Sequence, residues 1–289
     1  MNRVQVWTLA TRPKTLILSA CPVLVGVTIA ISAGHFSPWL FLCTLLTAMG
    51  IQIGTNLAND YYDFLKGADT SQRKGSLRVT QAGLVTPEAM KRAIILCFTL
   101  TFLLGCVLIW KGGITFAFLL AISIALGVLY TGGPYPLAYL GIGEMFVFLF
   151  FGPIAVLGTY YLQAHELSKE AFIAGIAPGA LSMAVLHANN MRDVEEDRKA
   201  NKRTLPVRFG RGFGRFMYIF CLSIIVIPCL FFYDKHPFIL LTLLTLLPAI
   251  PLMRAMMQTE DPKVLHLLFA NTGKLPWLYT LLFSIGWML

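Results

Sequence analysis

Charge is scarce in this 289-residue chain: 13% of the residues are Asp, Glu, Lys or Arg, whereas 57% are hydrophobic. A soluble domain carries about 25% charged residues, so this chain could not cover a water-facing surface of its own size. The composition excludes a soluble enzyme, a disordered chain and a secreted disulfide-rich scaffold. It predicts an integral membrane protein.

Cysteine clusters are also missing. The six cysteines all lie inside apolar runs, and none belongs to a C-x-x-C motif or shares a metal-ligand spacing with histidine. This pattern argues against disulfides and structural zinc, and it is typical of cysteine used as a small hydrophobic residue. The net charge of +9 then indicates basic cytoplasmic loops or a polyanionic substrate rather than nucleic acid.

Long apolar runs are abundant. A helix needs about 20 mostly apolar residues to cross a bilayer, whereas a transmembrane β-barrel would show alternating segments of about ten residues. Nine runs of the first kind predict an all-α polytopic membrane protein with nine transmembrane helices, and residues 1–289 form one domain. The runs are 15–33, 39–65, 88–110, 113–130, 142–162, 169–191, 213–233, 237–257 and 265–288.

Basic residues divide unequally between the two sides of the membrane. If the N-terminus is cytoplasmic, 20 of the 23 Lys and Arg residues fall on the cytoplasmic side. This asymmetry predicts the orientation, because cytoplasmic loops are enriched in Lys and Arg. We therefore expect the N-terminus inside and the C-terminus outside.

Seven of the fourteen acidic residues gather in two short stretches, at the cytoplasmic ends of the second and sixth runs. On a helix, residues four apart lie one above the other on the same face. Each stretch contains acidic and amide side chains at this spacing. They are Asn56, Asn59, Asp60 and Asp63 in the first stretch, and Asn189, Asn190, Asp193 and Asp197 in the second.

Such carboxylates repel one another unless a cation lies between them, and carboxylates near membrane depth mark functional sites. Asp and Asn oxygens without His or Cys favour magnesium or calcium. Magnesium takes one or two protein carboxylates and completes its shell with water and substrate phosphates. A solvated helix end would explain one stretch alone. Two stretches with matched spacing on one membrane face favour a magnesium-bridged diphosphate site.

Basic and aromatic residues near these stretches are further candidates. Lys199, Lys202 and Arg203 follow the second stretch directly, where they could neutralise phosphate oxygens. Arg12 opens the first run and could either face the same cavity or anchor the helix. Tyr130, Tyr135 and Tyr139 flank a Gly-Gly-Pro break, and either the site or an interfacial tyrosine belt explains them.

Two cytoplasmic loops are expected to cover the site. The loop 67–87 is long and polar for a membrane protein, and long loops in compact domains are often lids. We expect 67–87 and 192–212 to act as cap loops over a central cavity.

The pattern Asn59-Asp60-x-x-Asp63, together with Asp193-x-x-x-Asp197, resembles the paired metal motifs of the UbiA superfamily of intramembrane aromatic prenyltransferases. Three further patterns resemble the naphthoate branch of that superfamily: Gly133-Pro134-x-Pro136-Leu137-x-Tyr139, Asn189-Asn190-x-Arg192-Asp193 and Lys202-Arg203-Thr204-Leu205. The resemblance covers nearly the whole chain. It implies nine spans in a bacterial-type inner membrane, with the N-terminus on the cytoplasmic side.

One departure from the superfamily pattern concerns its third aspartate. That residue stands four positions after the second aspartate, where this chain has Gly67, and Asp69 follows two positions later. Gly67 is expected to end the helix. Whether Asp69 turns back toward the metal is left open.

The resemblance implies a reaction and a role for each candidate. Mg²⁺ would be held on a polyprenyl diphosphate, while the basic residues after the second stretch steady the departing pyrophosphate. In the naphthoate branch the prenyl group replaces the carboxylate of 1,4-dihydroxy-2-naphthoate with loss of carbon dioxide, giving demethylmenaquinone for menaquinone biosynthesis. The implied metal ligands are Asn59, Asp63, Asp69, Asp193 and Asp197, of which Asp63, Asp193 and Asp197 are the implied catalytic residues.

Other functions fit part of the pattern. Within the superfamily, the acceptor could be 1,4-dihydroxy-6-naphthoate, 4-hydroxybenzoate, homogentisate or haem. An ion-coupled transporter also uses intramembrane acids, but it is expected to carry them near mid-membrane. A phospholipid-type alcohol phosphotransferase would carry a denser run of Asp on one helix.

Overall fold

The computed structural model describes residues 1–67 and 77–289, and in this part of the chain helices joined by turns and loops form the fold, with no β-strand. The helices are α1 (Arg3–Thr11), α2 (Pro13–Ser32), α3 (Pro38–Leu65), α4 (Pro87–Gly112), α5 (Ile114–Leu129), α6 (Leu137–Leu140), α7 (Gly143–Phe150), α8 (Pro153–Ala164), α9 (Lys169–Ala174), α10 (Ile176–Arg192), α11 (Val194–Lys199), α12 (Leu205–Ser223), η1 (Ile224–Val226), α13 (Ile227–Phe232), η2 (Pro237–Thr245), α14 (Leu246–Gln258), α15 (Pro262–Thr272) and α16 (Leu275–Met288).

Seven helical segments in the described part of the chain are long and apolar enough to cross a membrane. The all-α membrane architecture is therefore confirmed. The other two predicted spans take a different form: the run 113–130 becomes the 16-residue helix α5, and the run 265–288 is divided between α15 and α16. The seven segments are Pro13–Ser32, Pro38–Leu65, Pro87–Gly112, Gly143–Ala164, Lys169–Arg192, Leu205–Phe232 and Pro237–Gln258.

Local sequence signals set where the longest helices begin. Ser37 caps α3 and Thr86 caps α4, each accepting a hydrogen bond from the backbone N–H three residues later. Each cap is followed by proline, whose missing N–H is no loss in the first turn of a helix. α3 ends at Leu65, and Gly67 follows with φ +65°, as expected for a residue that stops a helix.

Small residues bring the central helices close together. A Cβ on Gly152, at the break between α7 and α8, would come within 2.6 Å of the Gly175 carbonyl oxygen and 2.7 Å of the Gly179 Cα. Close backbone approach through small residues is the usual way in which membrane helices pack. The α7–α8 break is therefore held against the start of α10.

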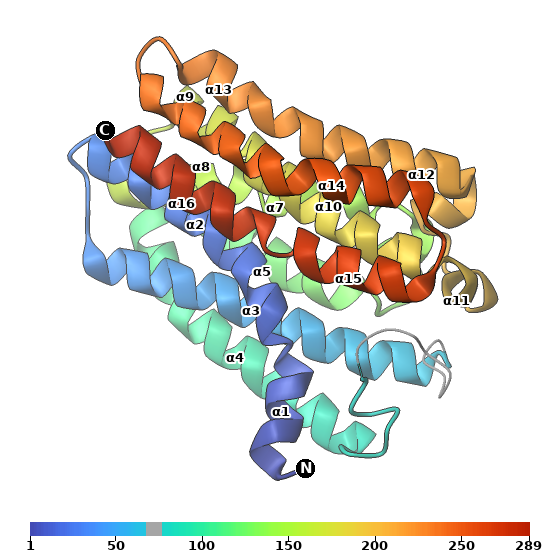
Figure 1. Cartoon of the computed structure of the whole chain (residues 1–289). Coiled ribbons are helices and arrows are strands. Elements are labelled where there is room, and N and C mark those ends of the chain that lie inside the picture. The colour runs from blue at the N-terminus through green and yellow to red at the C-terminus, as the bar shows by residue number, and fades with distance from the viewer. Residues whose placement is uncertain (68–76) are drawn as a thin grey trace.

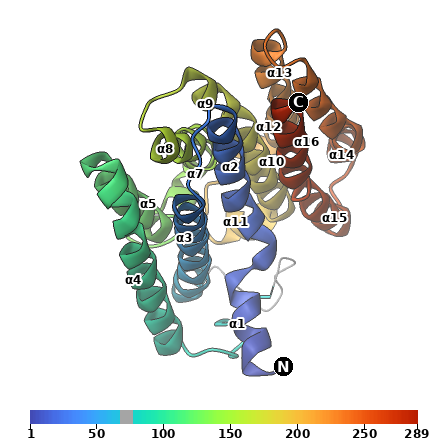
Figure 2. The ribbon, with the colours of Figure 1, turned by 90° about the vertical axis from the view of Figure 1, so that its left-hand side faces the viewer.

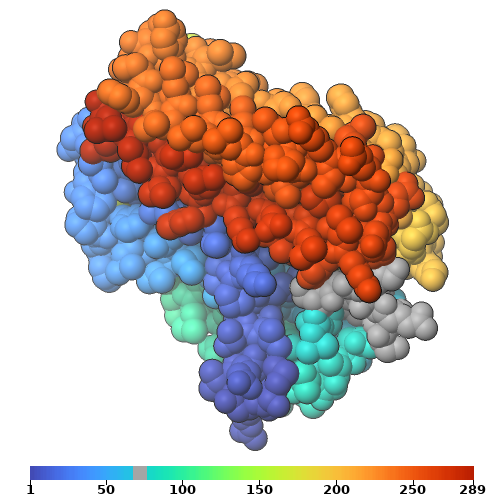
Figure 3. All heavy atoms as spheres, in the orientation of Figure 1, coloured from blue at the N-terminus to red at the C-terminus, as the bar shows by residue number. Residues whose placement is uncertain are grey.

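Viewed from one end, α4 and α5 lie on one side and α12, α14, α15 and α16 lie on the other, with α2, α3 and α10 between them (Figure 2). α1 projects from this body (Figure 3). The C-terminal end of α3 and the short helix α11 lie at the same end of the molecule, and the C-terminus lies at the opposite end (Figure 1). The fold thus brings both acidic stretches to one end of the bundle.

Candidate active site

Asp63, on the last turn of α3, links the first acidic stretch to the segment that follows the second. Its side chain is 1% exposed. Its Oδ2 lies 3.2 Å from Arg78 Nη2 and 3.6 Å from Lys202 Nζ, and its Oδ1 accepts a hydrogen bond from the Tyr139 hydroxyl at 3.2 Å. Because Lys202 follows the second stretch, the Asp63–Lys202 ion pair joins stretches that are far apart in the sequence.

Tyr139 lies between the two stretches. Lys66 Nζ and Lys202 Nζ lie 4.7 Å and 5.2 Å from the centroid of its ring, within the range of cation–π attraction. Its carbonyl oxygen accepts a hydrogen bond from the Arg203 backbone N–H at 3.1 Å. Burial lowers the pKa of the Lys66 ammonium, Asp63 raises it, and Lys202 lowers it further. The connection between α5 and α7 thus completes a compact group of charges.

The second stretch is bent where the spacing alone predicts a continuous helix. α10 ends at Arg192, Asp193 has φ −96° and ψ 9°, and α11 begins at Val194. The Asp197 N–H still donates to the Asp193 carbonyl oxygen at 2.8 Å, so the two residues remain one turn apart. Asp197 is buried and accepts a hydrogen bond from the Thr204 hydroxyl at 3.4 Å.

Asp193 is held by its own neighbour. Arg192 Nε and Nη2 donate to the two oxygens of Asp193, each at 2.6 Å, and Nη2 also donates to Asn189 Oδ1 at 2.9 Å. The guanidinium group lies 5.2 Å from the ring centroid of Phe269 on α15. A charge-assisted bidentate pair of this kind is both strong and directional. The negative charge of Asp193 is therefore balanced by the positive charge of Arg192.

The other polar residues of α3 bind neighbouring segments. Asp60 accepts hydrogen bonds from the backbone N–H groups of Val79 and Thr80, at 3.1 Å and 3.0 Å. Asn59 accepts a hydrogen bond from the Thr131 hydroxyl at 2.8 Å. Asn56 donates to the Thr11 carbonyl oxygen at 2.9 Å, which ties α3 to the end of α1. Asp60 and Asn56 thus organise the walls of the site.

Tyr130 lies close to both stretches. The carboxylates of Glu144, Asp197 and Asp63 all act electrostatically on its hydroxyl. Glu144 is buried, and it accepts a hydrogen bond from Asn190 Nδ2 at 2.9 Å. Tyr130 also lines the cavity described next, so it stands between the charged group and apolar space.

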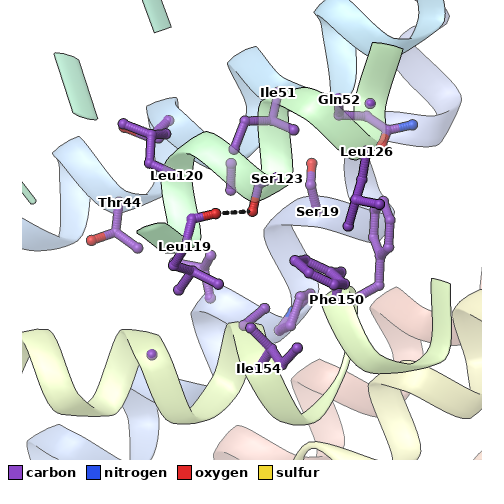
Figure 4. A pocket seen from close by; sticks show the side chains of 18 of the residues that line it. Ser19, Thr44, Ile51, Gln52, Leu119, Leu120, Ser123, Leu126, Phe150 and Ile154 are labelled. Carbon is purple, nitrogen blue, oxygen red and sulfur yellow. Dashed lines mark hydrogen bonds between the residues drawn. The ribbon is translucent and has the colours of Figure 1, made fainter. Parts of the chain in front are cut away.

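An apolar cavity of about 200 Å³ lies among α2, α3, α5, α7 and α8, with Tyr130 and Leu137 in its wall. Apolar side chains, including Ile51, Phe150 and Ile154, make up most of the lining (Figure 4). The Ser123 hydroxyl, one of the few polar groups there, donates to the Leu119 carbonyl oxygen at 2.7 Å. The site therefore combines a charged end with an apolar interior, which suits an amphiphilic substrate.

Several sequence candidates lie at the edge of this arrangement. Lys199 and Arg203 are exposed, although the Arg203 backbone contacts Tyr139. Arg12 links α1 to α2 with a left-handed backbone, φ 51°. Asp69 lies outside the described residues.

Two contributors, Arg78 and Lys66, counted in the sequence only as cytoplasmic charge. Tyr139 was a candidate through its place after the Gly-Gly-Pro break, where an interfacial tyrosine belt explained it equally well.

The side-chain oxygens near Asp63 suit magnesium better than a metal ion whose ligands all come from the protein. Within residues 1–67 and 77–289, no group of three or more His, Cys, Asp or Glu side chains is placed to hold a metal ion. The oxygen atoms of Asn59, Asp63, Asp193 and Asp197 are the ligand type that magnesium prefers. Magnesium also uses few protein carboxylates and takes phosphates for the rest of its shell.

A helical membrane protein with a buried charged group beside an apolar cavity has the architecture of an intramembrane enzyme that acts on a lipid-like substrate. The chain belongs to the UbiA prenyltransferase family, whose model matches residues 19–272.

One relative is the 1,4-dihydroxy-2-naphthoate octaprenyltransferase of Escherichia coli, 38% identical over 99% of this chain and 96% of its own length. Two solved structures share the fold. The apo structure of a UbiA homolog from Aeropyrum pernix has a TM-score of 0.72 and 13% identity, over 96% of this chain and 99% of its own. A UbiA homolog from Archaeoglobus fulgidus, bound to GPP and Mg²⁺, has a TM-score of 0.66 and 16% identity over the same shares.

Proposed function

We propose that this enzyme transfers a polyprenyl group from a polyprenyl diphosphate to 1,4-dihydroxy-2-naphthoate, in a magnesium-dependent reaction. The observation that carries the proposal is the Asp63 group, in which Arg78, Lys202 and Tyr139 surround one buried carboxylate close to an apolar cavity. The relatives named 1,4-dihydroxy-2-naphthoate octaprenyltransferase support the choice of acceptor.

The two ends of the site suit the two ends of the donor. Arg78, Lys202 and Lys66 can donate charge-assisted hydrogen bonds to diphosphate oxygens. The apolar cavity among α2, α3, α5, α7 and α8 suits the first isoprene units of the chain, since lipid-like ligands bury most of their surface in such pockets.

Magnesium would be held by Asn59 and Asp63 on one side and by Asp193 and Asp197 on the other, with Asp69 as a fifth candidate. The ion would supply positive charge to the diphosphate as that group leaves. Lys202 and Arg78 provide fixed positive charge at the same place, and this preorganised stabilisation of a leaving group is a large term in catalysis.

The bond changes balance without a further reactant. The C–O bond of the prenyl diphosphate breaks, and pyrophosphate leaves with the electron pair. A ring carbon of the naphthoate forms the new C–C bond to the allylic carbon. The bond to the carboxylate then breaks, carbon dioxide leaves, and its electron pair restores the aromatic ring. The product is the hydroquinone form of demethylmenaquinone.

The allylic cation must be kept from water. We propose that the loops 67–87 and 192–212 cap the site for this reason, on the cytoplasmic side of a bacterial-type inner membrane. In this proposal the N-terminus lies on the cytoplasmic side of the membrane and the C-terminus on the opposite side, in agreement with the distribution of Lys and Arg.

The decisive experiment supplies the purified protein in lipid nanodiscs with carboxyl-labelled 1,4-dihydroxy-2-naphthoate and a polyprenyl diphosphate. We expect prenylated product, pyrophosphate and labelled carbon dioxide in equal amounts. Chelation should stop the reaction, and Mg²⁺ without zinc should restore it. A parallel panel holds 1,4-dihydroxy-6-naphthoate, 4-hydroxybenzoate and homogentisate. Transfer to one of these acceptors alone would overturn the choice of acceptor, and no transfer to any acceptor would overturn the reaction.

A further inference from the structure

Two of the implied metal carboxylates are each paired with an arginine. Asp63 pairs with Arg78, and the two side chains are 1% and 6% exposed. Asp193 pairs with Arg192, and these side chains are 4% and 1% exposed. A metal ion can use these carboxylates fully only if the guanidinium groups move or find another anion. Buried pairs are costly to break, because each leaves an uncompensated charge.

Positive side chains also surround the Asp63 carboxylate. Lys202 Nζ lies 3.6 Å from its Oδ2, and Lys66 lies over the same Tyr139 ring as Lys202. A divalent cation that enters alone therefore meets like charges at short range. A diphosphate brings the negative charge that both the ion and the arginines require.

The geometry of arginine suits such an exchange of partners. A guanidinium group presents paired N–H donors that match phosphate as well as carboxylate. Arg78 lies in the loop 67–87, and the hydrogen bonds that Asp60 accepts from Val79 and Thr80 fix its backbone beside Asp63. A short side-chain movement, without movement of α3, would transfer Arg78 from Asp63 to a diphosphate.

We propose that this site takes up divalent metal and diphosphate as one unit, because Arg78 and Arg192 occupy the carboxylates of Asp63 and Asp193 until a diphosphate draws them away. The proposal rests on the proposed function and concerns the order in which its ligands bind. Two ligands coupled in this way raise each other's affinity by the same factor.

The test measures binding and needs no turnover. Mn²⁺ binding to the purified full chain in nanodiscs of neutral lipid is titrated by electron paramagnetic resonance, with and without the inert analogue geranylgeranyl thiodiphosphate. A protein-free blank corrects for Mn²⁺ that the analogue holds in solution. We expect the analogue to tighten Mn²⁺ binding to the wild-type protein about tenfold or more.

Substitutions separate the arginines from the rest of the site. Arg78→Gln and Arg192→Gln should each bind Mn²⁺ alone about tenfold more tightly than the wild type, because a carboxylate loses its partner, and should gain less from the analogue. Arg78→Lys and Arg192→Lys keep the charge and should bind Mn²⁺ alone nearly as the wild type does. Arg198→Gln, which removes an exposed arginine paired with Glu195, is the matched control and should change neither value.

The outcomes distinguish the two proposals. Equal Mn²⁺ affinity with and without the analogue, or Gln variants that bind Mn²⁺ no more tightly than Arg198→Gln, would overturn the coupling alone. A tenfold gain in the Lys variants would also overturn it, because loosened packing and not lost charge would then be the cause. If the wild-type protein binds Mn²⁺ in neither condition, the diphosphate site itself is wrong, and the proposed function fails with it.

Discussion

The two acidic stretches have the same spacing in the sequence but different surroundings in the structure. At the end of α3, Asp63 is bound by residues from three other parts of the chain: Arg78, Tyr139 and Lys202. At the end of α10, Asp193 is bound by Arg192 and Asn189, which lie within one helical turn of it. The described contacts of Asp63 thus come from the tertiary fold, whereas Asp193 has two partners within its own helical turn.

This difference has a physical consequence. A carboxylate held by distant segments senses any movement of those segments, whereas one held by its own helix keeps its partners when the rest of the site moves. Asp63 is therefore the residue through which the Arg78 segment of the loop 67–87, the α5–α7 connection and the loop before α12 act on one another. Arg192 and Asp193 are adjacent in the chain, so a movement of those segments does not by itself separate them.

The largest expected effect tests whether the two stretches are equivalent in function despite this difference. Asp63→Asn and Asp193→Asn each remove a carboxylate charge while keeping the side-chain shape. We expect each to reduce kcat by about 10³-fold, because each carboxylate would hold the Mg²⁺ whose positive charge stabilises the leaving diphosphate. Turnover with saturating substrates measures this. Near wild-type turnover in Asp193→Asn alone would show that the second stretch is structural.

The sequence could predict what depends on local chemistry. The apolar runs predict seven of the spans, because composition alone decides whether a helix is stable in lipid. The end of α3 follows from Gly67, whose φ of +65° suits a residue without a side chain. The position of Asp197 one turn after Asp193 also survives the bend in the chain, since the hydrogen bond between their backbones is kept.

What depends on tertiary contact could not be predicted in this way. Hydropathy averages over a window, so it did not show that α15 ends at Thr272 and α16 begins at Leu275. Arg78 is one of many basic residues in its loop, and no local pattern pairs it with Asp63. Asp60 has the spacing of a ligand, yet its carboxylate binds the backbone of Val79 and Thr80.

Asp60→Asn should have the second-largest effect and should act through Arg78. An amide in place of the carboxylate keeps one acceptor and places a donor against a backbone N–H, at a cost of about 1–3 kcal/mol. Arg78 then loses its fixed position. We expect the KM for the polyprenyl diphosphate to rise about tenfold with a smaller change in kcat, together with a lower unfolding temperature. A loss confined to kcat would mean that Asp60 itself touches the reacting groups.

Tyr139→Phe removes one of the three contacts that Asp63 makes with distant segments. The ring remains beside Lys66 and Lys202, and the hydrogen bond from its hydroxyl to Asp63 is lost. Such a bond to a charged group contributes about 1.5–3 kcal/mol in buried sites, but Arg78 and Lys202 remain in place and share the carboxylate. We therefore expect kcat/KM to fall by about fivefold, roughly 1 kcal/mol. A loss as large as that of Asp63→Asn would give the hydroxyl a direct role in the reaction.

Glu195→Gln should have the smallest effect, and it shows which carboxylates of the second stretch matter. Glu195 is 59% exposed and pairs with Arg198 and Arg211 at the surface, whereas Asp197, two residues later, is buried beside Thr204. Exposed ion pairs contribute less than about 1 kcal/mol because water and salt screen them. We expect turnover and Mn²⁺ affinity to stay within about twofold of the wild type, while Asp197→Asn loses activity as Asp63→Asn does. If Glu195→Gln is as damaging as Asp197→Asn, then the acidic run acts through its total charge, and the inward position of Asp197 has no special role.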